Sequence, residues 1–125
     1  MVNESGSYRE LTQGVSARLA TLRASTPEVM KSVSDLGRTA MADGLLGKKT
    51  KELIALALGV AARCDPCIGY HAQALVKLGA TKQELDETLG VAVYMGGGPS
   101  LMYAASAIAA FEEFSAAAPI QRKAE

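Results

Sequence analysis

The sequence has few of the residues that carry most protein chemistry and most β-structure. It has no tryptophan, two cysteines and one histidine, and aromatic residues make up 5% of its 125 positions. Alanine, leucine, glutamate and lysine are plentiful instead, which favours helix over sheet. The chain also lacks an excess of either charge, because its Lys and Arg number 13 and its Asp and Glu also number 13. A balanced chain has no long-range field to attract nucleic acid or anionic lipid, so neither is an expected partner.

Long hydrophobic runs are absent as well. No stretch of about 18 consecutive apolar residues occurs, so we expect no membrane-spanning segment. The N-terminal MVNESGSYRE is polar and has no basic region followed by an apolar one, so it does not resemble a secretory signal. We therefore expect a cytoplasmic protein. Thiols are mostly reduced in that compartment, where two cysteines are more often reactive or metal-binding than a structural disulfide.

The apolar residues recur with helical spacing along the whole chain, and no segment reads as a strand. We expect an all-α bundle of about six helices in a single domain, residues 1–125, since no linker is long enough to divide it. Tails are expected at residues 1–7 and after residue 116. The expected helices cover residues 8–22, 27–44, 48–62, 66–78, 82–95 and 100–114.

Local signals mark the ends of these helices. Thr26 can cap a helix that has Pro27 at its first position. Gly79 suits the end of a helix, and Thr81 and Glu84 have the spacing of a capping box. The three glycines at 96–98 should end the fifth helix.

Two expected helices, residues 48–62 and 100–111, have few polar faces. Helices this apolar are normally buried. A chain of this length can hardly bury both alone, so part of their surface is expected to meet other subunits.

The stretch CDPCIGYH, residues 64–71, holds both cysteines and the only histidine. The C-x-x-C spacing lets Cys64 and Cys67 form a small-ring disulfide. Pro66 is well placed in the first turn of a new helix, with Asp65 as a possible N-cap. The partial positive charge of that helix start favours thiolate over thiol.

His71 follows Cys67 by four residues, so in a helix the two side chains share a face and His71 can act as the base for Cys67. Glu52 is a candidate to orient the imidazole, although a glutamate in a first turn is also favoured by the helix dipole alone. The dipole by itself would activate Cys64. We favour Cys67 as the nucleophile, because a nearby base can remove its proton outright.

Other interpretations of these residues remain open. Cys64, Cys67, His71 and Glu52 are also four plausible zinc ligands, although structural zinc usually sits in smaller, loop-rich folds. The pair could instead act as a redox sensor without turnover, or as buried structural thiols.

The pattern of Glu52, eleven intervening residues, Cys64-x-x-Cys67, three more residues and His71 resembles a known family. It is similar to the AhpD-like alkyl hydroperoxidase branch of the carboxymuconolactone decarboxylase family. The resemblance covers about residues 35–110, and the later GATKQEL and GGGP segments are similar too.

The resemblance implies a helical protein that forms homo-oligomers, often trimers or hexamers, and acts as a thiol peroxidase or disulfide reductase without a cofactor or metal. It implies that Cys67 attacks the hydroperoxide, that Cys64 resolves the sulfenic acid, and that Glu52 and His71 relay protons. Electrons would come from a dithiol partner, either a lipoyl-bearing protein or another thiol. Some members also reduce a peroxiredoxin.

One feature departs from the family pattern. Some members carry a histidine between the two cysteines, where this chain has Asp65 and Pro66. Any role of that histidine is absent here. Decarboxylase members generally lack the cysteine pair, so lactone decarboxylation is not expected.

Overall fold

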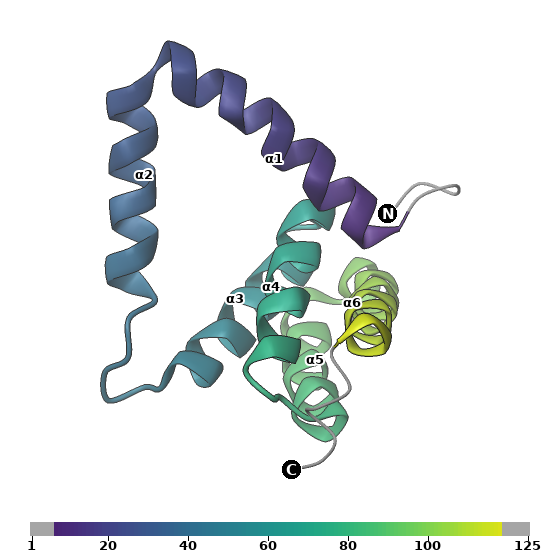
Figure 1. Cartoon of the computed structure of the whole chain (residues 1–125). Coiled ribbons are helices and arrows are strands. Elements are labelled where there is room, and N and C mark those ends of the chain that lie inside the picture. Colours follow the sequence, from purple (N-terminus) through teal and green to yellow (C-terminus); the bar gives the residue numbers. More distant parts are fainter. Residues whose placement is uncertain (1–6, 119–125) are drawn as a thin grey trace.

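The computed structural model describes residues 7–118, and these residues contain helices and no strand. The six-helix, all-α prediction is confirmed. Figure 1 shows the arrangement of the six elements. They are α1 (Tyr8–Ser25), α2 (Pro27–Ala40), α3 (Lys48–Ala61), α4 (Asp65–Lys77), α5 (Lys82–Gly96) and α6 (Gly98–Ala117).

Several predicted helix ends are confirmed. Thr81 and Glu84 form the capping box at the start of α5, with both reciprocal hydrogen bonds present. The glycines separate α5 from α6, where Gly97 has a φ of 77°. Of the predicted tails, residues 1–6 and 119–125 lie outside the described part of the chain, while Ser7 caps α1 through its hydroxyl.

Thr26 is the N-cap residue of α2 and Pro27 begins the helix, as expected, but Thr26 makes no side-chain cap, because its hydroxyl donates back to the Leu22 carbonyl at 2.9 Å. Other predicted ends were wrong. Helix α2 ends at Ala40 and not near Gly44. The Lys51 ammonium accounts for this early end. It donates to the carbonyl oxygens of Ala40 and Ala42 at 3.0 and 2.7 Å, in place of the backbone N–H groups that a longer helix would supply. Helix α6 is longer than expected at both ends.

Helices α3 to α6 pack together around the core, and the N-terminal end of α1 closes it (Figure 1). A glycine in α4 permits the close approach of α1 to α4, since a Cβ at Gly69 would lie 2.7 Å from Thr12 Cγ2. The most deeply buried large side chains of this core are Tyr8, Leu56, Ile68, Leu75, Leu85 and Val60.

The rest of α1 and all of α2 extend from this body as an arm (Figure 1). Helix α2 packs only against α1 among the described helices. The apolar stripe of α2 is consequently exposed, with Val29 61%, Val33 57% and Leu36 70% accessible. These side chains lie at positions i, i+4 and i+7, on one face of the helix.

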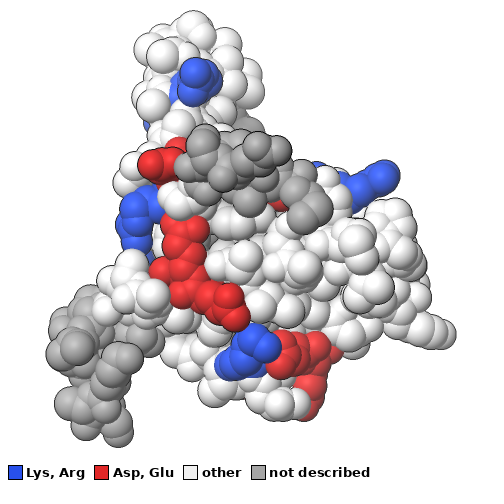
Figure 2. Space-filling model, turned by 90° about the vertical axis from the view of Figure 1, so that its right-hand side faces the viewer, with Lys and Arg blue, Asp and Glu red and all other residues white. Residues whose placement is uncertain are grey.

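None of the described helices combines the length and apolar character needed to cross a membrane. On the face drawn in Figure 2, acidic and basic side chains lie close to one another, beside wide uncharged areas. Both signs are thus mixed on this face.

Candidate active site

Cys64 and Cys67 form a disulfide at the start of α4. The prediction that Asp65 caps this helix was wrong. Cys64 is the N-cap, its sulfur accepts the Cys67 backbone N–H at 3.3 Å, and Asp65 is the first helical residue. Cys64 has the extended backbone of an N-cap, so its side chain reaches the free N–H of the first turn and that of Asp65 does not. Pro66 lies in the first turn, as expected.

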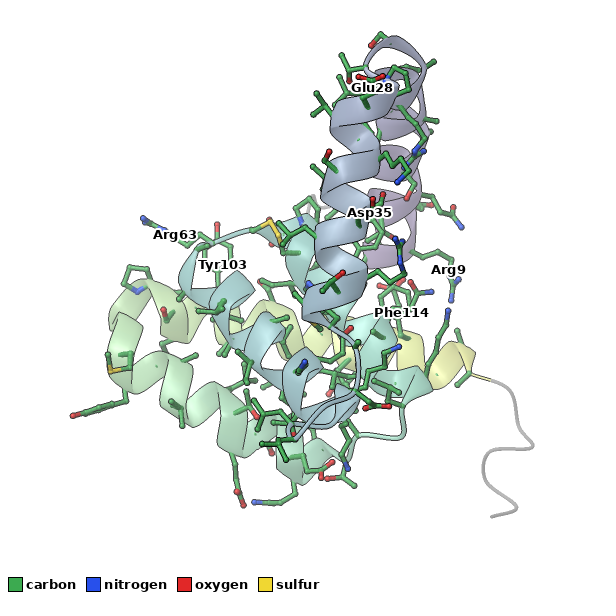
Figure 3. The ribbon with its side chains drawn as sticks, turned by 90° about the vertical axis from the view of Figure 1, so that its left-hand side faces the viewer. Arg9, Glu28, Asp35, Arg63, Tyr103 and Phe114 are labelled. Carbon is green, nitrogen blue, oxygen red and sulfur yellow. A yellow bond between two sulfur atoms is a disulfide. The ribbon has the colours of Figure 1, made fainter. Side chains whose placement is uncertain are left out.

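The turn before Cys64 holds the two sulfurs in place. Helix α3 ends in a Schellman motif, in which the N–H of Arg63 binds the Val60 carbonyl and the N–H of Cys64 binds the Gly59 carbonyl at 3.0 Å. Arg63 takes the left-handed conformation that this motif requires, with a φ of 58°, and no other described non-glycine residue has a positive φ. Figure 3 shows Arg63 projecting outward beside the disulfide. The break predicted at residues 63–65 is thus a tightly bonded turn.

Glu52 and His71 meet as the sequence predicted, although they lie on different helices. Glu52 Oε1 is 2.6 Å from His71 Nδ1, and the two side chains are 13% and 31% exposed. Glu52 is the fifth residue of α3, so its predicted place in the first turn was wrong. The helix begins at Lys48, and the dipole of its first turn does not account for a half-buried carboxylate at this depth.

The orientation of the histidine follows from this contact. With Nδ1 donating to the Glu52 carboxylate, Nε2 is the basic nitrogen of the neutral imidazole. Cys67 and His71 are separated by one turn of α4, so their side chains leave the helix on the same face. This arrangement can move a proton between the Cys67 sulfur and Nε2, directly or through a water.

Gly59 brings α3 close to the cysteine pair. A Cβ at Gly59 would lie 3.2 Å from Cys67 Cβ, closer than carbon atoms normally approach. This glycine was not singled out from the sequence. A glycine inside an otherwise apolar helix is the signal that could have found it, because such glycines often mark a close approach of backbones.

The contacts of Asp65 were also missed. The Tyr8 hydroxyl donates to Asp65 Oδ1 at 3.4 Å, across 57 positions of sequence. No local pattern connects these two residues. Only the packing of α1 onto α4 brings them together.

The zinc interpretation finds no support in the described part of the chain. Nowhere in residues 7–118 do three His, Cys, Asp or Glu side chains gather in an arrangement that could hold a metal ion. Both sulfurs are joined to each other, and the Glu52 carboxylate is bonded to His71.

Known proteins with similar sequences and folds were compared with this chain. The family model of the carboxymuconolactone decarboxylase family matches residues 27–110. An uncharacterized protein of Cupriavidus necator is 35% identical over 102 residues, which cover 82% of this chain and 90% of that protein.

Two solved structures also resemble the chain. One is the apo form of a carboxymuconolactone decarboxylase family protein from Legionella pneumophila, with 59% identity and a TM-score of 0.85 over 86% of this chain and 96% of the other. The second is a family member from Thermotoga maritima, for which a part in an antioxidative response has been suggested. It has 30% identity and a TM-score of 0.64, over 77% of this chain and 88% of the other.

The sequence resemblance to this family is therefore confirmed by the family model and by the two solved structures. The match covers more than half of the chain and includes all four candidate site residues. The chain belongs to the carboxymuconolactone decarboxylase family.

Proposed function

We propose that the protein is a thiol-dependent peroxidase and disulfide oxidoreductase that works through Cys64 and Cys67. One observation carries this proposal: a redox-capable cysteine pair lies one helical turn from a histidine whose other nitrogen is held by a carboxylate at 2.6 Å. A nucleophile, a base and a group that orients the base are the components of an activated thiol.

In the proposed cycle, the reduced Cys67 thiol gives its proton to Nε2 of His71, and the Glu52 carboxylate stabilises the imidazolium that forms. The Cys67 thiolate attacks the terminal oxygen of a hydroperoxide. An S–O bond forms, the O–O bond breaks, and the alkoxide takes the proton from His71 and leaves as an alcohol. Cys67 is then a sulfenic acid.

Cys64 completes the oxidation of the protein. Its sulfur lies at the helix N-cap, where the Cys67 N–H favours a thiolate. The Cys64 thiol gives its proton to His71, which is neutral again, and the resulting thiolate attacks the Cys67 sulfur. The S–O bond breaks, the hydroxyl group leaves as water with that proton, and the Cys64–Cys67 disulfide forms. A dithiol then restores both thiols by exchange and becomes a disulfide itself, so the net reaction converts a hydroperoxide and a dithiol into an alcohol, water and a disulfide.

The reductant in this proposal is a dithiol of the cytoplasm, either a lipoyl-bearing protein or another thiol. A peroxiredoxin is a further candidate partner, which the protein would reduce. The suggested antioxidative role of the Thermotoga maritima relative supports chemistry of this class.

The test is hydroperoxide consumption by metal-free, reduced protein, with cumene hydroperoxide as substrate and dihydrolipoamide as reductant. We expect turnover in the wild type, none in Cys67→Ser, and a loss of about 10²–10⁴-fold in His71→Ala, the range typical of a missing general base. Wild-type protein that forms its disulfide but does not turn over would point to a redox sensor. Stoichiometric zinc with unreactive thiols would contradict the proposal.

We also propose that the protein acts as a homo-oligomer, a trimer or a hexamer, joined through its arm. The exposed stripe of α2 needs an apolar partner, and α3 and α5 present an apolar groove lined mainly by Leu53, Ile54, Ala57, Leu58 and Val91. Ile54, Leu58 and Val91 are exposed by 45%, 65% and 63% in the single chain. The exposed stripe of α2 and this groove are on the same chain, so the stripe of one copy can bind the groove of an identical copy.

Light scattering after size-exclusion chromatography tests the assembly. We expect a mass several times that of one chain, and a monomer for Leu36→Glu. Ser34→Glu, on the opposite face of α2, serves as the control and should leave the mass unchanged. A wild-type protein that is monomeric at high concentration would contradict this part of the proposal.

A further inference from the structure

Asp65 lies between the two cysteines, and the proposed cycle gives it no part. It is the first residue of α4 and is half-buried. Its carboxylate accepts a hydrogen bond from the Tyr8 hydroxyl, which reaches it from the start of α1. An anion on this residue directly follows Cys64 and lies at the positive end of α4, the helix that begins with the cysteine pair.

Tyr8 is itself firmly held. It is 2% exposed, and Glu113 of α6 accepts the backbone N–H groups of Tyr8 and Arg9 at 2.8 and 3.0 Å. A Cβ at Gly69 would lie 3.3 Å from the Tyr8 ring, so the ring also packs directly on α4. The hydroxyl that meets Asp65 is therefore placed by both α4 and α6.

The surroundings keep Tyr8 a neutral donor. Burial raises the pKa of Tyr8 above its usual value and outweighs an opposing effect of Ser106, and the negative charge of Asp65 adds a further, smaller rise. Tyr103, which Figure 3 labels, also raises it. A neutral phenol that donates to an ionised carboxylate draws part of its negative charge away from the sulfurs.

The effect on the cysteines has a definite sign. A negative charge beside a dithiol disfavours the thiolate, and so it disfavours the reduced form at neutral pH. A dithiol whose reduced form is less stable has a lower reduction potential. Asp65 should therefore lower the potential of the pair, and the Tyr8 hydroxyl should moderate that effect.

We propose that Asp65, held by Tyr8, is a positioning residue that sets the reduction potential of the Cys64–Cys67 disulfide. This inference rests on the proposed function, because a low reduction potential makes the dithiol a better electron donor to an oxidant such as a hydroperoxide. The potential itself is measured without peroxide. A two-electron, two-proton exchange with a dithiol of known potential is sufficient: the protein disulfide and the reagent dithiol become the protein dithiol and the reagent disulfide.

The experiment equilibrates full-length protein with mixtures of dihydrolipoamide and lipoamide and measures the reduced fraction by alkylation and mass spectrometry. In Asp65→Asn, which keeps the shape and loses the charge, we expect the reduced form to be favoured about three- to tenfold more than in the wild type. A tenfold change is about 30 mV for this two-electron couple. In Tyr8→Phe we expect a shift in the opposite direction, toward the disulfide.

Two further variants make the result specific. Adding Tyr8→Phe to Asp65→Asn should have little effect, because the charge that the hydroxyl moderates is gone. Tyr70→Phe is the matched control. Tyr70 donates to the Thr12 carbonyl at 2.8 Å, so its loss removes a hydroxyl bridge between the same two helices and leaves Asp65 intact.

Tyr70→Phe should leave the potential unchanged. Shifts of Asp65→Asn and Tyr8→Phe in the same direction, or no shift beyond that of Tyr70→Phe, would overturn the proposal. If Tyr8→Phe does not fold, Asp65→Asn alone decides, since an unchanged or lowered potential contradicts the proposal. An altered potential in a protein without peroxide turnover would leave this inference standing while the peroxidase assignment fails.

Discussion

The turn from α3 to α4 and the turn from α4 to α5 have the same backbone design. Each helix ends in a Schellman motif, with the paired bonds Arg63 N–H to Val60 and Cys64 N–H to Gly59 at the first turn. The second turn has Gly79 N–H to Val76 at 3.1 Å and Ala80 N–H to Leu75 at 3.0 Å. The left-handed residue is arginine at the first turn and glycine at the second, with φ values of 58° and 78°. Only the first turn carries the cysteines.

The two turns also differ in length. At the second, Ala80 ends the motif and Thr81 begins the next helix as its N-cap. At the first, Cys64 does both, because it closes the motif and caps α4 with its own sulfur. The backbone of Cys64 is thereby fixed by two helices at once.

The two turns differ in the energetic cost of their left-handed residue. Glycine at the left-handed position costs little, whereas an ordinary residue there costs about 1–2 kcal/mol. The second turn has the low-cost solution and serves to connect helices. The first turn keeps a strained residue directly before the sulfurs, in agreement with the general association of local strain and functional sites.

The largest effects are expected at the residue whose carbonyl accepts the second bond of each motif. This residue is Gly59 in α3 and the fully buried Leu75 in α4. Leu75→Ala should lower the free energy of unfolding by about 2–5 kcal/mol, because it leaves a cavity in the core. Gly59→Ala should change it by less than about 1 kcal/mol. It should nevertheless slow the reaction of Cys67 with hydroperoxide roughly tenfold, since the new Cβ displaces Cys67 by a few tenths of an ångström. Denaturant titration measures the stability of both variants, and stopped-flow kinetics measures the rate at which their Cys67 reacts with hydroperoxide.

Equal rates for Gly59→Ala and the wild type would show that the close approach at Cys67 has no catalytic importance.

A smaller effect is expected at the left-handed glycine of the second turn. Gly79→Ala should destabilise the protein by about 1–2 kcal/mol, because alanine is strained at a φ of 78°. Its reaction with hydroperoxide should be unchanged. Gly90→Ala is the matched control, since Gly90 lies within α5 with no atom within 4 Å of an added Cβ. That variant should gain about 0.5–1 kcal/mol from helix propensity, measured by thermal unfolding.

The reverse change at the first turn should be smaller still. Arg63→Gly removes the left-handed strain but gives the unfolded chain more freedom, and the two effects largely cancel. We expect the free energy of unfolding to rise by less than about 1 kcal/mol, opposite in sign to Gly79→Ala. A loss of 2 kcal/mol or more would mean that the Arg63 side chain has stabilising contacts that the turn geometry does not reveal.

The smallest effect concerns pH and belongs to the second turn. The Lys49 ammonium holds the pKa of Glu84 below its ordinary value of 4.5, and the bond from the Thr81 backbone lowers it further. A lowered pKa contributes stability above the unfolded pKa and loses it as pH falls through the folded pKa. Glu84→Gln should therefore be slightly less stable than the wild type at pH 7. Thermal unfolding should show the difference shrink as the pH falls below the ordinary glutamate pKa and Glu84 becomes protonated in the folded protein. A difference that does not shrink in acid would contradict this assignment.

Sequence reasoning succeeded where signals are local. The break at 63–65 followed from Pro66, and the capping box followed from the spacing of Thr81 and Glu84. The meeting of Glu52 and His71 depended on the family resemblance, because two helices had to be placed together. The i, i+4 relation of Cys67 and His71 needed only helical geometry.

The errors arose where a side chain or a distant segment competes with a local preference. Asp65 is the better N-cap by residue type, but the Schellman motif already sets Cys64 in the capping position. The contact of Tyr8 with Asp65 depends on the docking of α1, which no short sequence pattern encodes. The same holds for the exposed arm, whose apolar stripe predicted a helix but not where it would lie.

The most direct test of the central claim is chemical trapping of the first oxidised species. Reduced Cys64→Ser protein is treated with one equivalent of cumene hydroperoxide in the presence of dimedone, and the adduct is located by mass spectrometry. The account predicts a sulfenic acid adduct on Cys67, and a much slower one on Cys64 in the matched Cys67→Ser protein. Equal or faster labelling of Cys64, or no adduct on either cysteine, would contradict the assignment of Cys67 as the peroxide-reducing nucleophile.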